Sequence, residues 1–374
     1  MTSGSPTLAP PPQSPRSAPP LPFLAGLATA APAQTLDQRQ MLELLGLAGD
    51  DFAEAIFARC GVTRRHLDLT PELVSQTLQA RSPQTERRTQ ELAEQAIAQL
   101  DFDPAEIGVV VSASLCTLGT PSLAHRLVDS LGLASDVDKY HVVGVGCASA
   151  VPLLRLAAQA LRERPGQRAL VVAAEWMSGI LTPVGADDPK VKTIGSSLFG
   201  DGAAAALLAL DELPGTAGES VGAPGVGPGA LPRILASAVH QLPGTLADVR
   251  SEMNALDSQV QMSKALPLYA RDRLAGLIDA FLARHGLDRA AIDHWPVHPG
   301  GRGILDGIKA GVGLSDDDVA ASAAVLAEHG NVGTPSAFFV LNELTQRSAQ
   351  RPGEYGLMAT IGPGVTVGLA LLQW

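Results

Sequence analysis

The chain has 374 residues, of which 46% are hydrophobic and 17% are charged, and its formal net charge is −11. This length and hydrophobic content can bury one large core or two ordinary domains, so we expect a globular protein. An acidic chain offers no basic face to a phosphate backbone and no polybasic patch to anionic lipids, which argues against nucleic-acid and membrane-surface binding. Cys60, Cys116 and Cys147 lack disulfide-framework or zinc-ligand spacing, so we expect free thiols in the reducing cytoplasm and no metal site.

The first residues differ in composition from the rest of the chain. Residues 1–20 are rich in proline and serine, and we expect them to form a disordered tail. The apolar stretch LPFLAGLATAAPAQ, residues 21–34, has two interpretations. Its ending Ala31-Pro32-Ala33 resembles a signal-peptide cleavage site, but the short, proline-broken run and the weakly charged segment before it favour a first core strand.

Further along, short apolar runs bounded by glycine alternate with longer runs of helical period, which is typical of a layered α/β sheet. The first half predicts helices over 121–133 and 148–164, and strands over 107–114, 141–146, 169–175 and 203–210. Residues 212–232 are almost all glycine, proline and small side chains, which predicts a surface loop or linker.

A similar order returns after the linker. The second half predicts a strand over 233–239, a helix near 265–285, an apolar run over 293–300, helices near 302–311 and 335–347, and a hairpin around Gly-Pro-Gly over 356–374. The two halves, residues 21–211 and 233–374, therefore suggest an internal duplication with a site where the halves meet.

One cysteine stands at a strand-to-helix junction, in the segment HVVGVGCASAVPLL. Unpaired backbone N–H groups and the helix dipole at such a junction stabilise a thiolate, so we expect the pKa of Cys147 to lie well below the ~8.5 of a free cysteine. Gly144 and Gly146 allow a sharp turn there, and small neighbours leave room for a substrate beside the sulfur. The alternative is a small buried hydrophobic side chain, which is the usual role of a lone cysteine.

A nucleophilic cysteine requires a base elsewhere in the fold. Among eight histidines, His298 stands at the end of an apolar run, directly before Pro-Gly-Gly and a predicted helix, where a strand end presents its side chain to a cleft. Asn331, in EHGNVGTPS, lies between two predicted helices and mirrors the placement of Cys147 in the other half. An asparagine there either caps a turn or donates its amide to a developing oxyanion.

Five segments together resemble one family. VGVGCASAV, LFGDGAAAAL, HPGGRGILD, HGNVGTPS and GPGVTV occur in the order, and at roughly the separations, seen in type III polyketide synthases, the chalcone-synthase-like branch of the thiolase superfamily. The resemblance runs from about residue 22 to the C-terminus. It implies an α/β fold of the duplicated, thiolase-like α-β-α-β-α kind, a homodimer, and a Cys-His-Asn triad that acts on CoA thioesters without a metal or any other cofactor.

The resemblance also implies roles for particular residues. Cys147 is similar to the family's nucleophile, His298 to the histidine that holds it as a thiolate, and Asn331 to the partner that binds the thioester oxygen. Phe199 matches the phenylalanine at the cavity mouth that orients malonyl-CoA for decarboxylation, and its alternative role is core packing beside a tight turn. The region that family members use to grip the CoA phosphates contains Arg59 and Arg64.

The residues that match the cavity wall differ from the plant pattern. When the motifs are aligned with those of the plant enzymes, the wall residues of this chain are smaller or more aliphatic: Ile180, Leu181, Val260, Gly333, Leu115, Cys116 and Thr117. Such walls favour the burial of methylenes, at roughly 0.8 kcal/mol per CH₂, over hydrogen bonding to a phenol. The resemblance therefore implies a fatty acyl starter and an alkylpyrone- or alkylresorcinol-like product, with an aromatic starter as the alternative.

Two other classes of protein stay open. A ketoacyl-acyl-carrier-protein synthase III shares the implied fold and triad, and the closing GLALLQW resembles it slightly, but HPGGRGILD has the polyketide-synthase form. The second is a non-catalytic acyl-binding relative, against which the intact triad argues.

Overall fold

The computed structural model describes residues 20–185, 188, 190–210, 230–253 and 258–374. The predicted tail, apart from its last residue, and most of the predicted linker lie outside the described residues.

The strands are β1 (Pro22–Ala30), β2 (Thr35–Asp37), β3 (Arg64–His66), β4 (Ile107–Ala113), β5 (Asp138–Val142), β6 (Arg168–Glu175), β7 (Gly202–Leu210), β8 (Arg233–Gln241), β9 (Val249–Met253), β10 (Ser258–Met262), β11 (Tyr355–Gly362) and β12 (Thr366–Gln373). The helices are α1 (Gln38–Leu44), α2 (Asp51–Arg59), α3 (Pro71–Val74), α4 (Leu78–Ile97), α5 (Leu123–Ser130), α6 (Ala150–Ala160), α7 (Lys190–Leu198), α8 (Leu266–Asp272), α9 (Leu274–Ala283), α10 (Arg302–Val312), α11 (Ala320–His329) and α12 (Ser336–Arg347).

Eight strands form a sheet in the order β11-β12-β8-β1-β7-β6-β4-β5. The two halves of the chain meet where β1 pairs briefly with β8, at Phe23 and Arg233. Outward from this join, the first half has two antiparallel pairings, β1 with β7 and β7 with β6, followed by the parallel pairing of β6 with β4. The second half repeats this order with β8, β12 and β11, followed by parallel bridges from His294 and Val297 to β11. The repeated order supports the predicted internal duplication.

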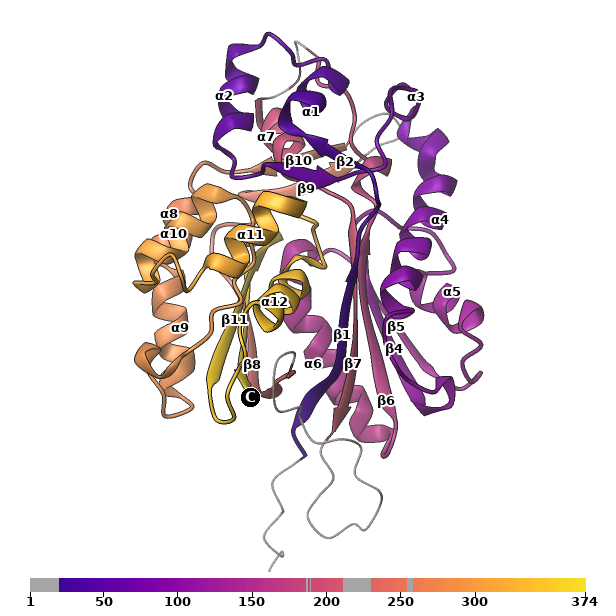
Figure 1. Cartoon of the computed structure of the whole chain (residues 1–374), viewed down its shortest axis with the longest axis vertical. Helices are drawn as coiled ribbons and strands as arrows, with labels where there is room; N and C mark the ends of the chain where they lie inside the picture. Colours follow the sequence, from indigo (N-terminus) through magenta and orange to yellow (C-terminus); the bar gives the residue numbers. More distant parts are fainter. Residues whose placement is uncertain (1–19, 186–187, 189, 211–229, 254–257) are drawn as a thin grey trace, which may run out of the picture.

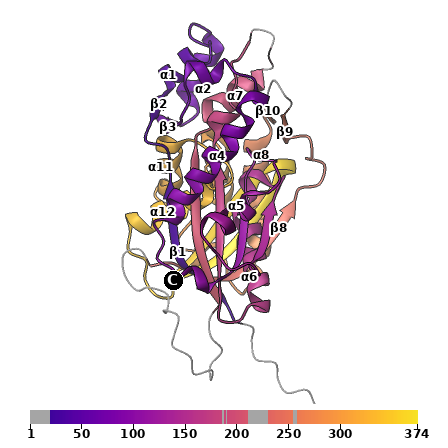
Figure 2. The ribbon, with the colours of Figure 1, turned by 90° about the vertical axis from the view of Figure 1, so that its right-hand side faces the viewer.

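Helices cover both faces of each half-sheet and create a layered core (Figure 1). α4 and α5 pack on the outer face of the first half (Figures 1 and 2), and α9 and α10 lie on the outer face of the second (Figure 1). α6 and α12 lie between the two half-sheets, where Leu153 and Phe338 belong to one buried cluster with residues of both halves. β4 is buried along its whole length, and its sequence IGVVVSA is apolar except at Ser112, as expected for a strand covered on both faces. The expected α-β-α-β-α layering is confirmed.

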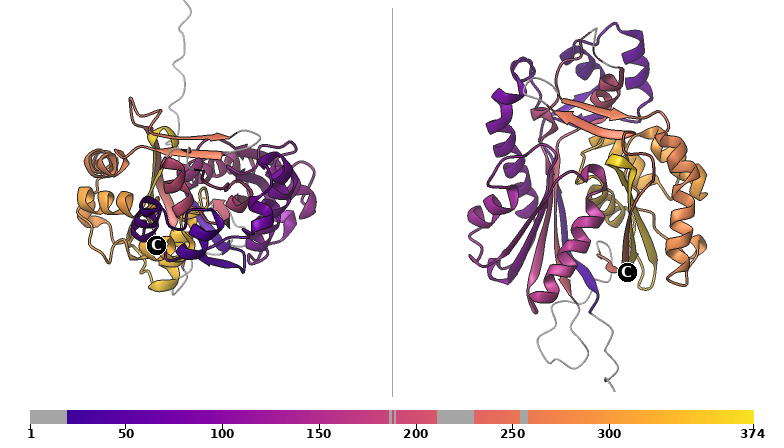
Figure 3. Two further views of the ribbon diagram at one scale, coloured as in Figure 1. Left: turned by 90° about the horizontal axis from the view of Figure 1, so that it is seen from above. Right: turned by 180° about the vertical axis from the view of Figure 1, so that it is seen from behind.

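A smaller group of elements lies at one end of these layers. Short strands β2 and β3, helices α1, α2 and α7, and the β9–β10 hairpin gather there, at the top of Figure 1 and in both views of Figure 3. Asp37 and Gln40 form a capping box that starts α1 directly after β2. This end of the molecule carries α7 and β10 next to one another, and both contribute to the cavities described below.

Three predicted elements differ from the structure. The strand predicted over 141–146 is β5 (Asp138–Val142), which ends before Gly144 because that glycine has φ +86°. The apolar run 293–300 makes only single bridges to β11, since Pro296 and Pro299 have no N–H to donate to a ladder. The helix near 265–285 is two helices, α8 and α9, separated at Arg273. No helix in the described part of the chain is both long and apolar enough to cross a membrane.

Candidate active site

Glycines shape the turn that carries Cys147. Gly144 and Gly146 have φ of +86° and +53°, and Cys147 follows in a 3₁₀ turn, Gly146–Ala148, that leads into α6. The Gly-Pro-Gly turn between β11 and β12 packs against it, so closely that a Cβ on Gly362 would lie 2.6 Å from the backbone nitrogen of Ala148. The predicted sharp turn is therefore present, and the C-terminal hairpin helps to hold it.

Asn331 is fixed in both its backbone and its side chain. Its N–H donates to the Leu198 carbonyl at 2.8 Å, and its carbonyl accepts from Gly200 at 3.2 Å. Its side-chain Oδ1 accepts from the Gly333 N–H at 2.9 Å and from the Ser336 hydroxyl at 3.1 Å. These two donors define which end of the amide is oxygen, and the Cys147 sulfur lies 3.7 Å from both the Nδ2 and the Oδ1 atoms. A donor is thus positioned beside the thiol.

His298 is buried, with 2% of its surface exposed. Its backbone N–H donates to Ala359 on β11, which holds the residue at the edge of the second half-sheet. Burial lowers the pKa of His298 to about 4, so the imidazole is neutral at pH 7. A Cβ on Gly300 would lie 3.3 Å from its Nε2, so glycine at this position keeps that side of the ring uncrowded. Among the described residues, the buried Nδ1 has no hydrogen-bond partner.

The expectation of a lowered Cys147 pKa is wrong for the free protein. Loss of hydration raises the pKa of this thiol to about 12, and the hydrogen bond with Asn331 offsets only part of that effect. The Glu175 carboxylate raises it further. The helix end and the predicted neighbour His298 both favour the thiolate, but the burial of the sulfur has the larger effect on its pKa. In the free protein the Cys147 thiol and the His298 imidazole are therefore both neutral.

This charge state has a measurable consequence. Since the thiolate is the reactive form and the pKa is raised, its fraction should grow about tenfold per pH unit between pH 6 and 9. We expect the rate of Cys147 alkylation by iodoacetamide to rise accordingly, as measured by peptide mass spectrometry with Cys147→Ser as the blank. A rate that stays constant from pH 6 to 9 would instead show a thiolate–imidazolium pair and overturn this assignment.

A buried carboxylate supports the loop beside the thiol. Glu175, at the end of β6, accepts from the Leu115 N–H at 2.9 Å, from the Cys116 N–H at 3.1 Å and from the Ser114 hydroxyl at 3.1 Å. Burial raises the pKa of Glu175 despite these donors. In the sequence, Glu175 is recognisable only as an acidic residue at the end of an apolar strand, and this pattern alone predicted no role for it.

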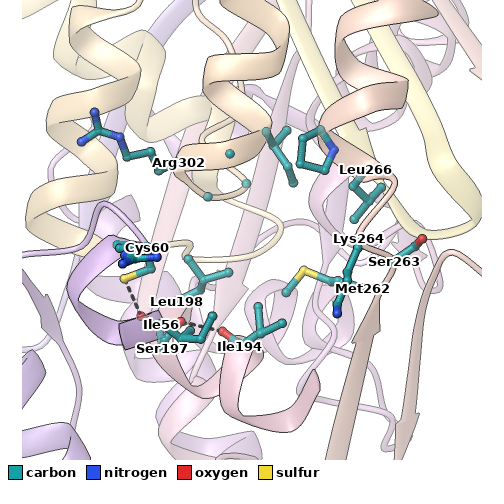
Figure 4. Close-up of a pocket in the computed structure, with 16 residues that line it drawn as sticks. Ile56, Cys60, Ile194, Ser197, Leu198, Met262, Ser263, Lys264, Leu266 and Arg302 are labelled. Atoms are coloured by element: carbon teal, nitrogen blue, oxygen red, sulfur yellow. Dashed lines mark hydrogen bonds between the residues drawn. The ribbon is translucent and has the colours of Figure 1, made fainter. Parts of the chain in front are cut away.

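The larger of two cavities near these residues has a volume of about 330 Å³. Its wall is mostly apolar, and Ile194, Leu198 and Met262 line it (Figure 4). Gly300, which also lines it, lies next to His298. Three exposed cationic side chains lie at its border: Arg59, Lys264 and Arg302. In Figure 4, Cys60 and Arg302 lie on one side of this cavity and Lys264 and Met262 on the other.

Only one of the two predicted arginines belongs to this cavity. Arg59 lines it, whereas Arg64 forms an ion pair with Glu328 at 2.6 Å and lines a separate surface hollow. Arg64 therefore does not share the cavity of Arg59, because its guanidinium is engaged with a carboxylate on α11, and its contact with CoA stays a prediction. The sequence analysis did not single out Lys264, in the loop before α8, or Arg302, at the start of α10, since an isolated basic residue carries no recognisable spacing.

The smaller cavity has a volume of about 30 Å³. Four residues of the predicted wall line it: Ile180, Leu181, Phe199 and Val260. The other lining residues are Met177, Thr182, Lys192, Gly195 and Ser196. These four residues, which the motifs predicted for one wall, come from β10, the end of α7 and the segment after β6.

Four residues predicted for the wall do not line this cavity. Leu115, Cys116 and Thr117 lie in the loop held by Glu175, and the Cys116 sulfur is 3.8 Å from that of Met177, which lies between them and the cavity. Gly333 has φ +71°, and a Cβ there would lie 2.7 Å from the Met177 methyl group. In the free protein Gly333 shapes the turn and donates its N–H to Asn331, and its predicted contact with the substrate stays a prediction.

Comparison with known proteins identifies the family. Residues 30–215 match the model of FAE1/type III polyketide synthase-like proteins, and residues 233–373 match the C-terminal domain of chalcone and stilbene synthases. The chain is 29% identical over 368 residues to a 3,5-dihydroxyphenylacetyl-CoA synthase of Streptomyces toyocaensis, covering 95% of this chain and 91% of the relative. It is 30% identical over 287 residues to a 1,3,6,8-tetrahydroxynaphthalene synthase of Streptomyces peucetius subsp. caesius, covering 76% of this chain and 72% of the relative.

A solved structure is similar over nearly the whole chain. The crystal structure of PKS-I from the brown alga Ectocarpus siliculosus has a TM-score of 0.81 and 25% sequence identity, covering 96% of this chain and 99% of that one. The chain belongs to the type III polyketide synthase family and has its thiolase-like fold. Members of this family are acyl-transferring enzymes, so the sequence-based classification is confirmed.

Proposed function

We propose that Cys147, His298 and Asn331 are the catalytic groups of a decarboxylative Claisen condensation between an acyl-CoA starter and malonyl-CoA. The observation that carries this proposal is the amide of Asn331, which Gly333 and Ser336 hold through its oxygen and whose Nδ2 donor lies 3.7 Å from the Cys147 sulfur. An orientation fixed before the substrate binds is what stabilisation of an oxyanion requires.

In the first step, the Cys147 sulfur attacks the thioester carbonyl of the starter while the neutral imidazole of His298 takes the thiol proton. The carbonyl π electrons move to the oxygen, which accepts a hydrogen bond from Asn331. Collapse of the tetrahedral intermediate breaks the bond to the CoA sulfur, and His298 returns the proton to that sulfur. The products are an acyl-Cys147 enzyme and free CoA.

In the second step, malonyl-CoA loses carbon dioxide, and the electron pair of the broken C–C bond forms an enolate. Donors from His298 and Asn331 stabilise its oxygen. The enolate carbon then attacks the acyl carbonyl, the Cys147 thiolate leaves, and a β-ketoacyl-CoA longer by two carbons results. Repetition gives a poly-β-keto chain that cyclises, for which an alkylpyrone- or alkylresorcinol-like product is proposed.

The larger cavity is proposed to hold the CoA arm. Its apolar wall suits the alkyl parts of pantetheine, and the cationic groups of Arg59, Lys264 and Arg302 at its border suit the phosphates. Gly300 brings this cavity next to His298, which supports delivery of the thioester to the catalytic groups. A homodimer in the cytoplasm is proposed as the working state on the family resemblance.

A fatty acyl starter is proposed for the smaller cavity. Its walls include the aliphatic side chains of Ile180, Leu181 and Val260, which favour methylenes over a phenol. An aromatic starter, as in chalcone-synthase-like enzymes, is the second candidate, and Phe199 at this cavity supplies an aromatic face for it.

Substitution of Val260 tests the starter class. Each methylene that enters the cavity contributes up to about 0.8 kcal/mol, so kcat/KM should rise with chain length until the cavity is filled. Val260→Phe should therefore shorten the preferred starter while leaving acylation by acetyl-CoA nearly unchanged. We would compare product profiles by mass spectrometry for C2 to C16 and aromatic acyl-CoAs with malonyl-CoA.

Val239→Phe, on the exposed side of β8, is the matched control and should not alter the profile. A parent enzyme that prefers aromatic starters, or a Val260→Phe profile identical to the parent's, would contradict the fatty acyl assignment.

A further inference from the structure

Two histidines that the mechanism does not use stack on one another beside the turn that carries Asn331. His329 is the last residue of α11, and its ring lies on the ring of His66 at the end of β3, with ring centres 4.9 Å apart and planes inclined by 19°. The ring of Phe339 on α12 meets His329 edge-on, with centres 5.0 Å apart. The three rings therefore join β3, α11 and α12 where the chain turns toward Asn331.

The backbone between His329 and Asn331 packs directly against another part of the backbone. A Cβ on Gly330 would lie 2.3 Å from the Leu198 carbonyl oxygen, and a Cβ on Gly200 would lie 2.3 Å from the His329 carbonyl oxygen. The Asn331 N–H donates to the same Leu198 carbonyl at 2.8 Å. Because these segments are in backbone contact, a shift of His329 also moves Asn331.

His66 holds the other side of this contact. Its carbonyl accepts from the N–H of Asp201, the residue directly after Gly200, at 2.8 Å. Its Nδ1 lies 2.6 Å from the Pro32 carbonyl oxygen, which fixes the plane of the ring from outside. The stack of His66 on His329 thus closes a ring of contacts around the backbone on both sides of Gly200.

His329 takes part in this arrangement through its ring faces and not through a hydrogen bond or a charge. Among the described residues, its buried Nδ1 has no hydrogen-bond partner. Burial and, next to it, the neighbouring His66 lower the pKa of His329 to about 4, so the ring is uncharged at pH 7. The adjacent Glu328 carboxylate is paired with Arg64 at 2.6 Å. Another neutral aromatic ring should therefore be able to replace this imidazole.

We propose that His329 is a positioning residue for the oxyanion donor, because its stack on His66 holds the Asn331 amide where charge develops on the substrate oxygen. This inference rests on the proposed function and adds a residue that acts on the reaction only through Asn331. A donor contributes fully only when it is held in place beforehand, and a displacement of about 1 Å can cost on the order of 100-fold in rate.

A double-mutant cycle on the decarboxylation of malonyl-CoA tests this role. We would measure kcat with malonyl-CoA alone for the parent, His329→Ala, Asn331→Ala and the variant with both changes. His329→Ala should lower kcat by about 10- to 100-fold in the parent but by less than about twofold in Asn331→Ala, since the donor that it positions is already absent there. A residue that only supports the fold would lower the rate by the same factor in both backgrounds, and that result would overturn the proposal.

Two further variants of the stack test the ring contact itself. His329→Phe keeps an aromatic ring of similar size and should retain kcat within about threefold of the parent's. A loss in His329→Phe as large as in His329→Ala would contradict positioning by ring contact. His66→Ala removes the partner ring and should give the same cycle with Asn331→Ala, so the proposal can still be overturned if His329→Ala does not fold.

His285→Ala is the matched control and should leave kcat unchanged. His285 also follows the end of a helix and meets a phenylalanine edge-on, with ring centres 5.0 Å apart, but that residue, Phe281, belongs to a different buried cluster from Phe339. An equal loss in His285→Ala would show that the effect is not specific to the stack. If Asn331→Ala itself decarboxylates at the parent rate, the proposed function has failed; if it does not, but His329→Ala and His66→Ala do, only the positioning role has failed.

Discussion

Cys147→Ala is expected to abolish acyl transfer and chain extension while malonyl-CoA decarboxylation persists. The variant removes the only atom that can carry the acyl group, so condensation should fall by a factor on the order of 10³ or more. His298 and Asn331 keep their positions, because Gly333, Ser336 and the Ala359 carbonyl hold them independently of the sulfur. The enolate can therefore still form.

The measurement follows carbon dioxide and acetyl-CoA release alongside polyketide formation in the same samples. Cys116→Ala is the matched control, because that thiol is buried behind Met177 and is not assigned a catalytic role. Polyketide formation by Cys147→Ala at a rate near the parent's, or its loss in Cys116→Ala alone, would show that the nucleophile has been misassigned.

The second large effect concerns Asn331→Ala. Loss of one oxyanion donor lowers a rate by about 10²–10³, and both the acylation and the decarboxylation steps use this amide. Both rates should therefore fall together, in contrast to Cys147→Ala, where decarboxylation alone survives. Asn342→Ala is the control, since that amide lies on α12 and bonds Thr29 at 3.4 Å, away from the thiol.

Decarboxylation and acylation would be measured separately, with malonyl-CoA alone and with acyl-CoA alone. Full decarboxylase activity in Asn331→Ala would contradict the role of its Nδ2. A loss of similar size in Asn342→Ala would show that the effect comes from a disturbed helix instead.

The proposed catalytic groups could be selected from the sequence because each stands in a local pattern that the backbone dictates. Gly144 and Gly146 predict the turn at Cys147, and the structure shows a positive φ at both. His298 and Asn331 likewise lie beside glycines, and Gly300 and Gly333 leave room or supply a donor for them. Glycines close to a residue in the sequence therefore indicate a sharp turn there, and this signal does not require knowledge of the fold.

Other parts of the site depend on contacts between distant segments, which local patterns do not contain. Arg59 and Arg64 look equivalent in the sequence, but only the fold places Glu328 beside Arg64. Ser336 likewise gains its role from its bond to the Asn331 side chain. The thiol pKa was misjudged for the same reason, because burial is a property of the whole fold.

The most direct test of the account is to trap the acyl-enzyme. The parent enzyme would be incubated with acetyl-CoA and with hexanoyl-CoA, digested, and the peptide that contains Cys147 analysed by mass spectrometry; malonyl-CoA would then be added to a parallel sample. We predict an acyl group on Cys147, none on Cys60 or Cys116, and its conversion into a polyketide once malonyl-CoA is present. An unmodified Cys147 peptide in a sample that nevertheless forms polyketide would contradict the central claim.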